Sequence, residues 1–249
     1  MIRFVDTVKR VTAYKCHYLT QKNTKVRERL YILTLALVFT GSLAMAQRVE
    51  SERVSIAVRS GANLQKFDER GSDGRIQKNY LLPGVHFGMN VNIPVSSDFH
   101  FQTGFLIITK GSKGVVETST TTRLSYLEMP LNLVYKKPWG SGYIMLGFGP
   151  YVARGFGGHV TSGTGAVEFS RDIKFTDPAK DDGLSWTSYF ERMDVGANMF
   201  VGYMMSSGLF LQVNTQQGLV KINPTYNQYP GDRSSIKNMG FGVSLGYKF

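Results

Sequence analysis

The chain has 249 residues, of which 29 are Lys or Arg and 18 are Asp or Glu, and it contains one cysteine, Cys16. A single cysteine excludes an intramolecular disulfide framework and a metal site built from several cysteines. The basic excess is concentrated near the N-terminus, where four basic residues between positions 22 and 29 precede an apolar run. It therefore indicates a targeting signal rather than nucleic-acid binding.

Residues 1–46 are predicted to be an N-terminal extension and a signal peptide. The uncharged run Leu30–Phe39 follows the basic segment and precedes Ala44-Met45-Ala46, which is the pattern of a cleaved secretory signal. The run is too short for a membrane-spanning helix, which needs about 20 apolar residues. Cleavage after Ala46 leaves residues 47–249 as the mature domain, with 21 Lys and Arg, 16 Asp and Glu and no cysteine.

Eight segments of the mature chain alternate between apolar and small or polar residues, the period of two that is expected of β-strands. They are Val54–Asn63, Leu82–Ile93, Phe99–Thr109, Thr122–Lys136, Gly142–Arg154, Met193–Met205, Leu209–Gln216 and Lys237–Phe249. Most have the length of about ten residues that a tilted strand needs to cross a bilayer. They are longer than the typical soluble strand of about five to six residues.

The last segment shows the alternation most clearly, because six apolar residues from Met239 to Phe249 alternate with Asn, Gly, Ser and Lys. In a soluble barrel the apolar face of such a strand points inward. In a transmembrane barrel it points to lipid, and the small polar face lines a narrow lumen. The aromatic C-terminus favours the membrane interpretation.

The connections between the predicted strands alternate in length. Short turns follow the second, fourth and sixth strands, and long polar segments follow the others, including 110–121 and 155–192, with Ser185–Phe190 extending the sixth strand. This pattern predicts an all-β fold, an eight-stranded antiparallel up-and-down transmembrane β-barrel with periplasmic termini. A soluble up-and-down barrel has the same meander, but the signal peptide and the terminal Phe249 favour the membrane. Five aromatic residues flank the short turns and are interpreted as a girdle, although core positions fit the same parity: Phe99, Phe101, Tyr135, Trp139 and Tyr143.

Four polar residues are predicted by parity to face the lumen: Arg59, His86, Glu128 and Asn132. We interpret them as a structural polar cluster with an Arg59–Glu128 ion pair, because buried charges are costly unless paired. A hydrolase that uses His86 and Glu128 is the alternative. No Ser-His-acid set is visible at the rim, and no catalytic residue or enzymatic activity is predicted.

The other titratable residues do not form a ligand set. His100 and His159 are far apart in the sequence, and the spacing of Asp177, Asp181 and Asp182 departs from that of a calcium-binding loop. No metal or cofactor is therefore expected.

Several motifs occur in order at the predicted strands: Tyr126–Leu131 (Y-L-E-M-P-L), Leu106–Lys113, Gly147–Tyr151 (G-F-G-P-Y) and Lys237–Phe249. In these motifs the chain resembles the PorT-like outer-membrane β-barrel family of Bacteroidota over most of residues 54–249. The resemblance implies an eight-stranded barrel in the outer membrane. One founding member of that family is linked to protein secretion.

The prediction that follows is an integral outer-membrane protein of non-enzymatic role, envelope- or secretion-associated or ligand-binding through long extracellular loops. A small-substrate pore and a lipid-modifying enzyme are the alternatives. The expected partners are outer-membrane lipid, the barrel assembly machinery through the C-terminal strand with Phe249 as its signal, and envelope proteins. No nucleic acid is expected.

Overall fold

A computed structural model describes residues 53–114, 119–164, 167–176, 188–223 and 233–249. The predicted signal peptide and extension, residues 1–46, lie outside this part of the chain. The strands are β1 (Ser55–Arg70), β2 (Ile76–Gln77), β3 (Asn79–Tyr80), β4 (Leu82–Pro94), β5 (Phe99–Gly114), β6 (Ser119–Trp139), β7 (Gly142–Thr164), β8 (Val167–Thr176), β9 (Ser188–Glu191), β10 (Met193–Met205), β11 (Leu209–Gly218) and β12 (Ser235–Lys248).

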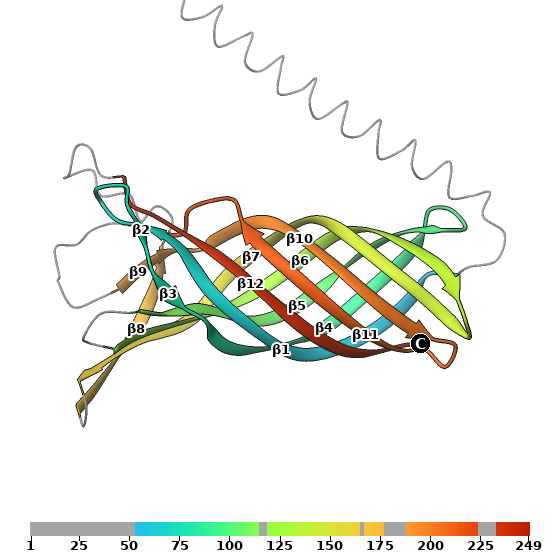
Figure 1. Cartoon of the computed structure of the whole chain (residues 1–249), viewed down its shortest axis with the longest axis horizontal. Helices are drawn as coiled ribbons and strands as arrows, with labels where there is room; N and C mark the ends of the chain where they lie inside the picture. Colours follow the sequence, from blue (N-terminus) through green and yellow to red (C-terminus); the bar gives the residue numbers. More distant parts are fainter. Residues whose placement is uncertain (1–52, 115–118, 165–166, 177–187, 224–232) are drawn as a thin grey trace, which may run out of the picture. The chain divides into compact units, whose positions relative to one another are not determined.

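Eight of these strands close into a ring, as the sequence predicts (Figure 1). Consecutive members pair antiparallel in the order β1, β4, β5, β6, β7, β10, β11 and β12. The ring closes where β12 pairs with β1, from Ala57 opposite Lys248 to Arg70 opposite Ser235. In the described part of the chain, no helix has the length and apolar character needed to cross a membrane. The predicted all-β eight-stranded barrel is therefore confirmed.

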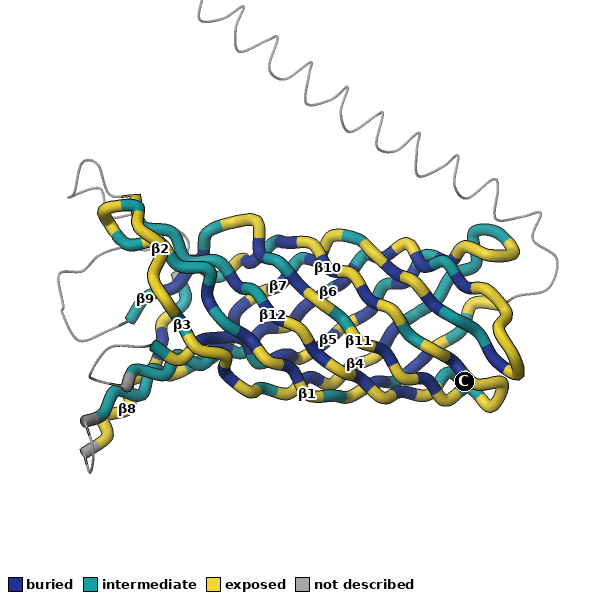
Figure 2. Tube along the Cα trace, viewed as in Figure 1, coloured by how far each residue is buried: buried dark blue, intermediate teal, exposed yellow. Residues whose placement is uncertain are grey.

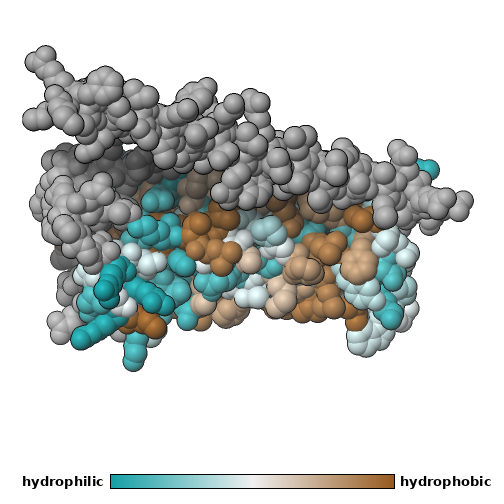
Figure 3. All heavy atoms as spheres, turned by 90° about the horizontal axis from the view of Figure 1, so that it is seen from above, coloured by the Kyte–Doolittle hydropathy of each residue, from teal (hydrophilic) through white to brown (hydrophobic). Residues whose placement is uncertain are grey.

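Buried and exposed residues alternate along the strands of the barrel (Figure 2). On β12, Phe241, Val243 and Leu245 are 46–54% exposed, while Ser244 between them is fully buried. Large apolar side chains are exposed on all eight ring strands, and Figure 3 shows hydrophobic residues gathered along the middle of the visible face. Burying one such side chain is favourable by about 1.5–3 kcal/mol. The exposed belt thus requires an apolar surrounding.

The two ends of the barrel differ. Short connections and the C-terminus lie at one end, here called the short-turn end, and β2, β3, β8 and β9 lie at the other, the long-loop end (Figure 1). Gly140 and Gly208 occupy the tight turns with φ of 59° and 92°, which favours glycine because a Cβ atom is disfavoured there. In outer-membrane barrels the short turns face the periplasm.

The long-loop end departs from the sequence prediction. The segments expected to be loops are partly strand, since β6 has 21 residues and β7 has 23, about twice what a bilayer crossing needs. Part of Ser185–Phe190, which was expected to extend the sixth predicted strand, lies outside the described residues. The described part belongs to β9, which pairs in parallel with β8 and is not a continuation of β10. The barrel wall therefore continues beyond the exposed apolar belt into a rim.

Within the barrel, two apolar clusters flank a polar section, and β6 passes through all three. Its inward residues run from Leu124 and Tyr126, through Glu128 and Asn132, to Val134. The cluster at the long-loop end, here called the apolar cap, comprises Phe67, Ile108, Leu124, Tyr126, Tyr151, Ala153, Ile173, Phe190 and Ile222. The cluster at the short-turn end comprises Ala57, Val134, Met145, Phe200, Met204 and Phe210.

The aromatic girdle is confirmed only in part. Phe99 and Trp139 are exposed, and the Phe99 ring lies 5.3 Å from that of Tyr135 between centroids. Tyr143 instead packs against the interior cluster at the short-turn end, so its assignment to the girdle is wrong. Tyr143 lies two residues before Met145 on β7, so it shares the inward face with Met145, whereas Leu146 is on the outward face.

Candidate functional site

The polar section of the interior is organised around Lys110 of β5. Its Nζ lies 2.9 Å from Oε2 of Glu128 and 3.0 Å from Oδ2 of Asp194, and all three side chains are at most 1% exposed. An ammonium group without water is stable only where carboxylates and other polar groups replace its hydration. Two carboxylates from β6 and β10 supply this replacement.

Neighbouring strands satisfy the carboxylates. Gln216 donates from Nε2 to Oε1 of Glu128 at 2.6 Å, and Asn238 donates from Nδ2 to Oδ2 of Asp194 at 2.9 Å. The Tyr151 hydroxyl donates to the same Asp194 oxygen at 3.3 Å, and the lysine ammonium lies 4.0 Å from the Tyr151 ring centroid. The network takes one side chain from each of six consecutive ring strands: Lys110, Glu128, Tyr151, Asp194, Gln216 and Asn238. Polar contacts therefore extend across the lumen and connect these strands.

The four residues predicted to face the lumen are all buried: Arg59 at 8% exposure, His86 at 5%, Glu128 at 1% and Asn132 at 1%. The expected Arg59–Glu128 ion pair is wrong, because the ion-pair partner of Glu128 is Lys110. No ion pair of Arg59 with that carboxylate occurs among the described residues. Parity thus placed the four side chains inside but did not identify their contacts.

His86 takes part in a second chain of polar contacts, next to the first. Its Nε2 lies 2.7 Å from Oγ of Ser244, its Nδ1 lies 3.4 Å from Oδ1 of Asn63, and Asn63 donates from Nδ2 to the carbonyl of Thr109 at 2.7 Å. Ser244, His86 and Asn63 are connected in the same order as the nucleophile, the general base and the residue that orients the base in a hydrolase. Ser244 is fully buried, however, so a substrate has no access to its hydroxyl.

Inward glycines provide the space that the larger side chains occupy. A Cβ atom at Gly61 would lie 2.8 Å from the His86 ring and even closer to the Val243 carbonyl. A Cβ atom at Gly196 would lie 2.6 Å from the Tyr151 ring. The glycines that alternate with apolar residues in the sequence therefore serve the packing of the lumen.

Of the six network residues, only Glu128 belongs to the polar cluster predicted from the sequence, and the two other charged residues, Lys110 and Asp194, are not part of that prediction. Lys110 was assigned to a loop, because the third strand was ended at Thr109, yet continuing its alternation by one residue places Lys110 on the inward face with Ile108. Asp194 was assigned to the inward face of its strand but was not connected with a cation. Extending the strand by one residue therefore predicts that Lys110 faces the lumen, but it does not identify the partners of Lys110.

The other candidates remain separate. His100 is buried on β5, and His159 lies towards the end of β7, whereas Asp177, Asp181 and Asp182 fall outside the described residues. Within the described ranges, no group of three or more His, Cys, Asp and Glu residues is placed to hold a metal ion. The described part of the chain thus does not bring these residues together.

Residues 33–249 match the family described as outer membrane protein beta-barrel domain. The chain belongs to this family. Together with the closed ring and its exposed apolar belt, this membership makes the protein an integral outer-membrane β-barrel surrounded by lipid. No curated protein matches the sequence.

Several solved outer-membrane proteins are similar to this barrel. Ail of Yersinia pestis, in complex with the heparin analogue sucrose octasulfate, is 10% identical with a TM-score of 0.39, over 80% of this chain and 100% of that chain. Neisserial surface protein A is 12% identical with a TM-score of 0.41, over 80% and 100%. OprG from Pseudomonas aeruginosa is 14% identical with a TM-score of 0.44, over 80% and 97%. The assignment itself rests on the family match and on the ring of strands.

Proposed function

We propose that this outer-membrane barrel is non-enzymatic, that its lumen is closed by a fixed polar plug, and that the long-loop end binds its ligand. The observation that carries the proposal is the buried ion-pair network of Lys110, Glu128 and Asp194. An eight-stranded barrel has an interior just wide enough for side chains. The apolar cap, defined above, lies next to this network and shares Tyr151 with it. Together they leave the rim as the surface available for binding.

A groove at the rim supports the ligand-binding part of the proposal. It has a volume of about 370 Å³ and lies between β1, β2 and β3. Charged, amide and aromatic side chains line it, including Lys66, Glu69, Lys78, Asn79 and Tyr80. Asn79 donates from Nδ2 to Oε2 of Glu69 at 2.8 Å, and Tyr80 is 60% exposed. Such a mixed polar lining suits a polar ligand rather than a lipid chain.

Conductance of the reconstituted protein tests the closed lumen and separates it from a small-substrate pore. We expect no stepwise current across a planar bilayer, because the charged groups of the network are at most 1% exposed and fill the lumen between the strands. A variant with Tyr126→Ala and Tyr151→Ala removes two buried rings and provides the conducting control. Stepwise currents from the wild-type protein at the level of that control would contradict the proposal.

The enzyme alternative depends on His86 and Glu128. Both are buried, and the hydroxyl beside His86 belongs to the fully buried Ser244. We therefore expect His86→Ala and Glu128→Ala to change stability without abolishing any lipid-modifying activity of the outer membrane. Loss of such an activity from a variant that still folds would revive the enzyme assignment.

We further propose that Phe249 signals to the barrel assembly machinery. Its side chain is 73% exposed and packs edge-on against Tyr247 with 5.1 Å between ring centroids, so it contributes little to the packed interior. Deleting it should reduce the amount of heat-modifiable protein in the outer membrane while leaving the refolded barrel as stable as before. Normal assembly of the deletion variant would contradict this role.

The finer family assignment is also a proposal. In the motif Tyr126–Leu131 that resembles the PorT-like family of Bacteroidota, Tyr126, Glu128 and Pro130 are the buried residues, and Glu128 binds Lys110. The motif thus coincides with the polar plug, and the envelope- or secretion-associated role that we propose rests on the resemblance alone. Residues 1–46 are proposed to be removed on export. Mass spectrometry of protein from outer membranes should give Gln47 as the first residue.

A further inference from the structure

The groove at the rim lies where the pairing of strands in the barrel wall is interrupted. β1 pairs with β4 as far as Gln65, which lies opposite Leu82, and with β2 again from Glu69, which lies opposite Gln77. Among the described strands, the three residues of β1 between these positions pair with β12 alone, and β3 pairs with β5. The groove of about 370 Å³ lies at this interruption, between β1 and the segment formed by β2 and β3 (Figure 1).

The groove also lies at the edge of the exposed apolar belt. On the outward face, Leu64 of β1 is 37% exposed and lies opposite Phe241 of β12, which is 46% exposed. Two residues further towards the long-loop end, and therefore on the same face, Lys66 lies opposite Met239, and both line the groove. Because the short turns face the periplasm, this edge of the belt is at the level of the lipid head groups of the outer leaflet.

Two lysines in the lining are available to an anion. Among the described residues, the ammonium groups of Lys66 and Lys78 have no ion-pair or hydrogen-bond partner. The two carboxylates of the lining have neighbours of their own, since Glu69 accepts a hydrogen bond from β3 and Asp68 lies opposite Lys237 of β12. A lysine ammonium binds phosphate as a point charge, through charge-assisted hydrogen bonds.

The rest of the lining suits a sugar more than a bare phosphate. Tyr80 is 60% exposed and combines an apolar ring with a hydroxyl, as aromatic residues at a membrane interface do. Gln77 adds an amide with both donor and acceptor atoms.

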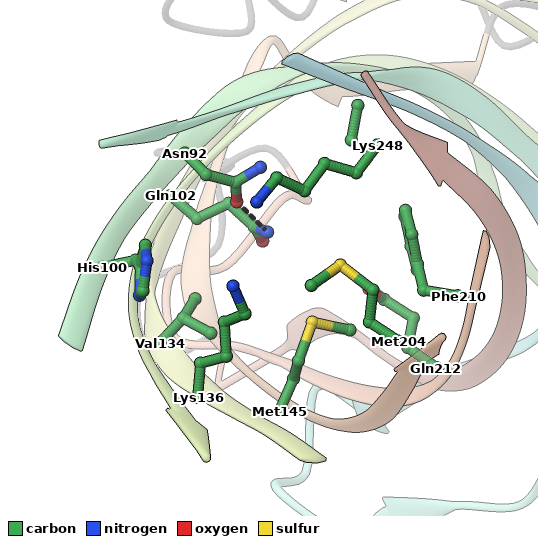
Figure 4. Close-up of a pocket in the computed structure, with 11 residues that line it drawn as sticks. Asn92, His100, Gln102, Val134, Lys136, Met145, Met204, Phe210, Gln212 and Lys248 are labelled. Atoms are coloured by element: carbon green, nitrogen blue, oxygen red, sulfur yellow. Dashed lines mark hydrogen bonds between the residues drawn. The ribbon is translucent and has the colours of Figure 1, made fainter. Parts of the chain in front are cut away.

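Volume separates this groove from the other place where two lysines line one space. The cavity at the short-turn end, with Lys136 and Lys248 in its lining, has a volume of about 30 Å³ (Figure 4). That is room for no more than about two water-sized groups. The rim groove, at about 370 Å³, is within the range of small-molecule sites and admits a phosphorylated sugar ring.

We propose that the rim groove binds the phosphorylated sugar head group of an outer-leaflet glycolipid. Lys66 and Lys78 hold the phosphate, Tyr80 and Gln77 contact the sugar, and the acyl chains lie along the belt beside Leu64. A lipid is favoured over a soluble sugar phosphate because the groove is continuous with the lipid-facing surface. This ligand class rests on the proposed role of the long-loop end as the ligand-binding surface.

Titration of monophosphoryl lipid A, a phosphorylated glucosamine disaccharide with acyl chains, tests the site. The folded protein is held in a nonionic detergent, and native mass spectrometry counts the bound lipid. We expect one saturable site on the wild-type barrel. Lys66→Gln and Lys78→Gln should each weaken binding about tenfold, because each removes one charge-assisted hydrogen bond.

Arg154→Gln is the matched control, because Arg154 is an exposed basic residue on β7, on the far side of the ring from β1. It should leave binding unchanged, and heat-modifiable migration on gels confirms that each variant is folded. An equal loss in all three variants would show only a general attraction of basic residues to head groups and would overturn the site. Absence of saturable binding to the wild-type protein would overturn it as well.

Glucosamine 6-phosphate provides the soluble source in a competition experiment. Failure to displace the lipid at a hundredfold excess supports the glycolipid. Displacement at a concentration equal to that of the lipid would overturn the lipid as the ligand, while the long-loop end would remain the binding surface. If neither probe binds, the groove is lost to both proposals, and only the closed lumen, which conductance tests, would stand.

Discussion

The two ends of the barrel interior differ in the contacts that a buried lysine makes there. Around Lys110, one ammonium group lies within 3.0 Å of each of two carboxylates, and hydroxyl and amide donors complete their contacts. At the short-turn end, the Lys136 ammonium lies 4.2 Å from the centroid of the Tyr143 ring, which packs against the apolar cluster there. The first arrangement connects strands through charge-assisted hydrogen bonds, whereas the second includes a cation–π contact. The same alternation of sequence thus places an ion-pair network at one level and an ammonium–aromatic contact at another.

The largest expected effect comes from removing the cation at the centre of the network. Lys110→Met keeps the length of the side chain but leaves Glu128 and Asp194 as neighbouring buried carboxylates. Breaking a buried ion pair by removing one partner costs about 3–5 kcal/mol. Guanidinium unfolding of the protein in detergent, followed by far-ultraviolet circular dichroism, should show a loss of this size.

The exposed Lys113 on the same strand gives the matched control, and Lys113→Met should change stability by less than about 0.5 kcal/mol. Adding Glu128→Gln and Asp194→Asn to Lys110→Met removes the uncompensated charges and should recover part of the loss. An unchanged unfolding midpoint for Lys110→Met would mean that the network does not hold the barrel closed.

A smaller effect is expected from crowding the second polar chain. Gly61→Ala places a methyl group 2.8 Å from the His86 ring and against the Val243 carbonyl. Overpacking of this kind costs about 1–3 kcal/mol. Gly157→Ala is the control, because nothing lies within 4 Å of its Cβ position. If both substitutions have the same effect in the unfolding experiment, the tight contact at Gly61 is not a constraint.

The fold could be predicted from the sequence because a barrel is encoded locally. Each strand carries its own alternation, and a period of two fixes which face every side chain occupies once one face is known. Phe241 and Ser244 were placed correctly on this basis. The strand ends were predicted less well, because the outer parts of β6 and β7 are rich in Ser, Thr and Gly, so that apolar and polar residues alternate less clearly there.

The interior contacts could not be predicted in the same way. Parity gives the direction of a side chain but not its height along a tilted strand, and partners across the lumen come from strands far apart in sequence. Lys110 and Asp194 are 84 positions apart, yet their charged groups are 3.0 Å apart. Arg59 and Glu128 point inward as predicted but at positions that do not form an ion pair. Predicting which charged residues form ion pairs therefore requires the register of the closed ring of strands.

The smallest expected effect is at the short-turn end. Lys136→Gln should change the free energy of unfolding by about 1 kcal/mol, because it removes the contact of the ammonium with the Tyr143 ring. The same guanidinium unfolding experiment measures this change, and Lys137→Gln, at an exposed neighbouring position, is the matched control. A loss as large as that of Lys110→Met would instead show that Lys136 belongs to a network of the same kind, and the distinction between the two ends would disappear.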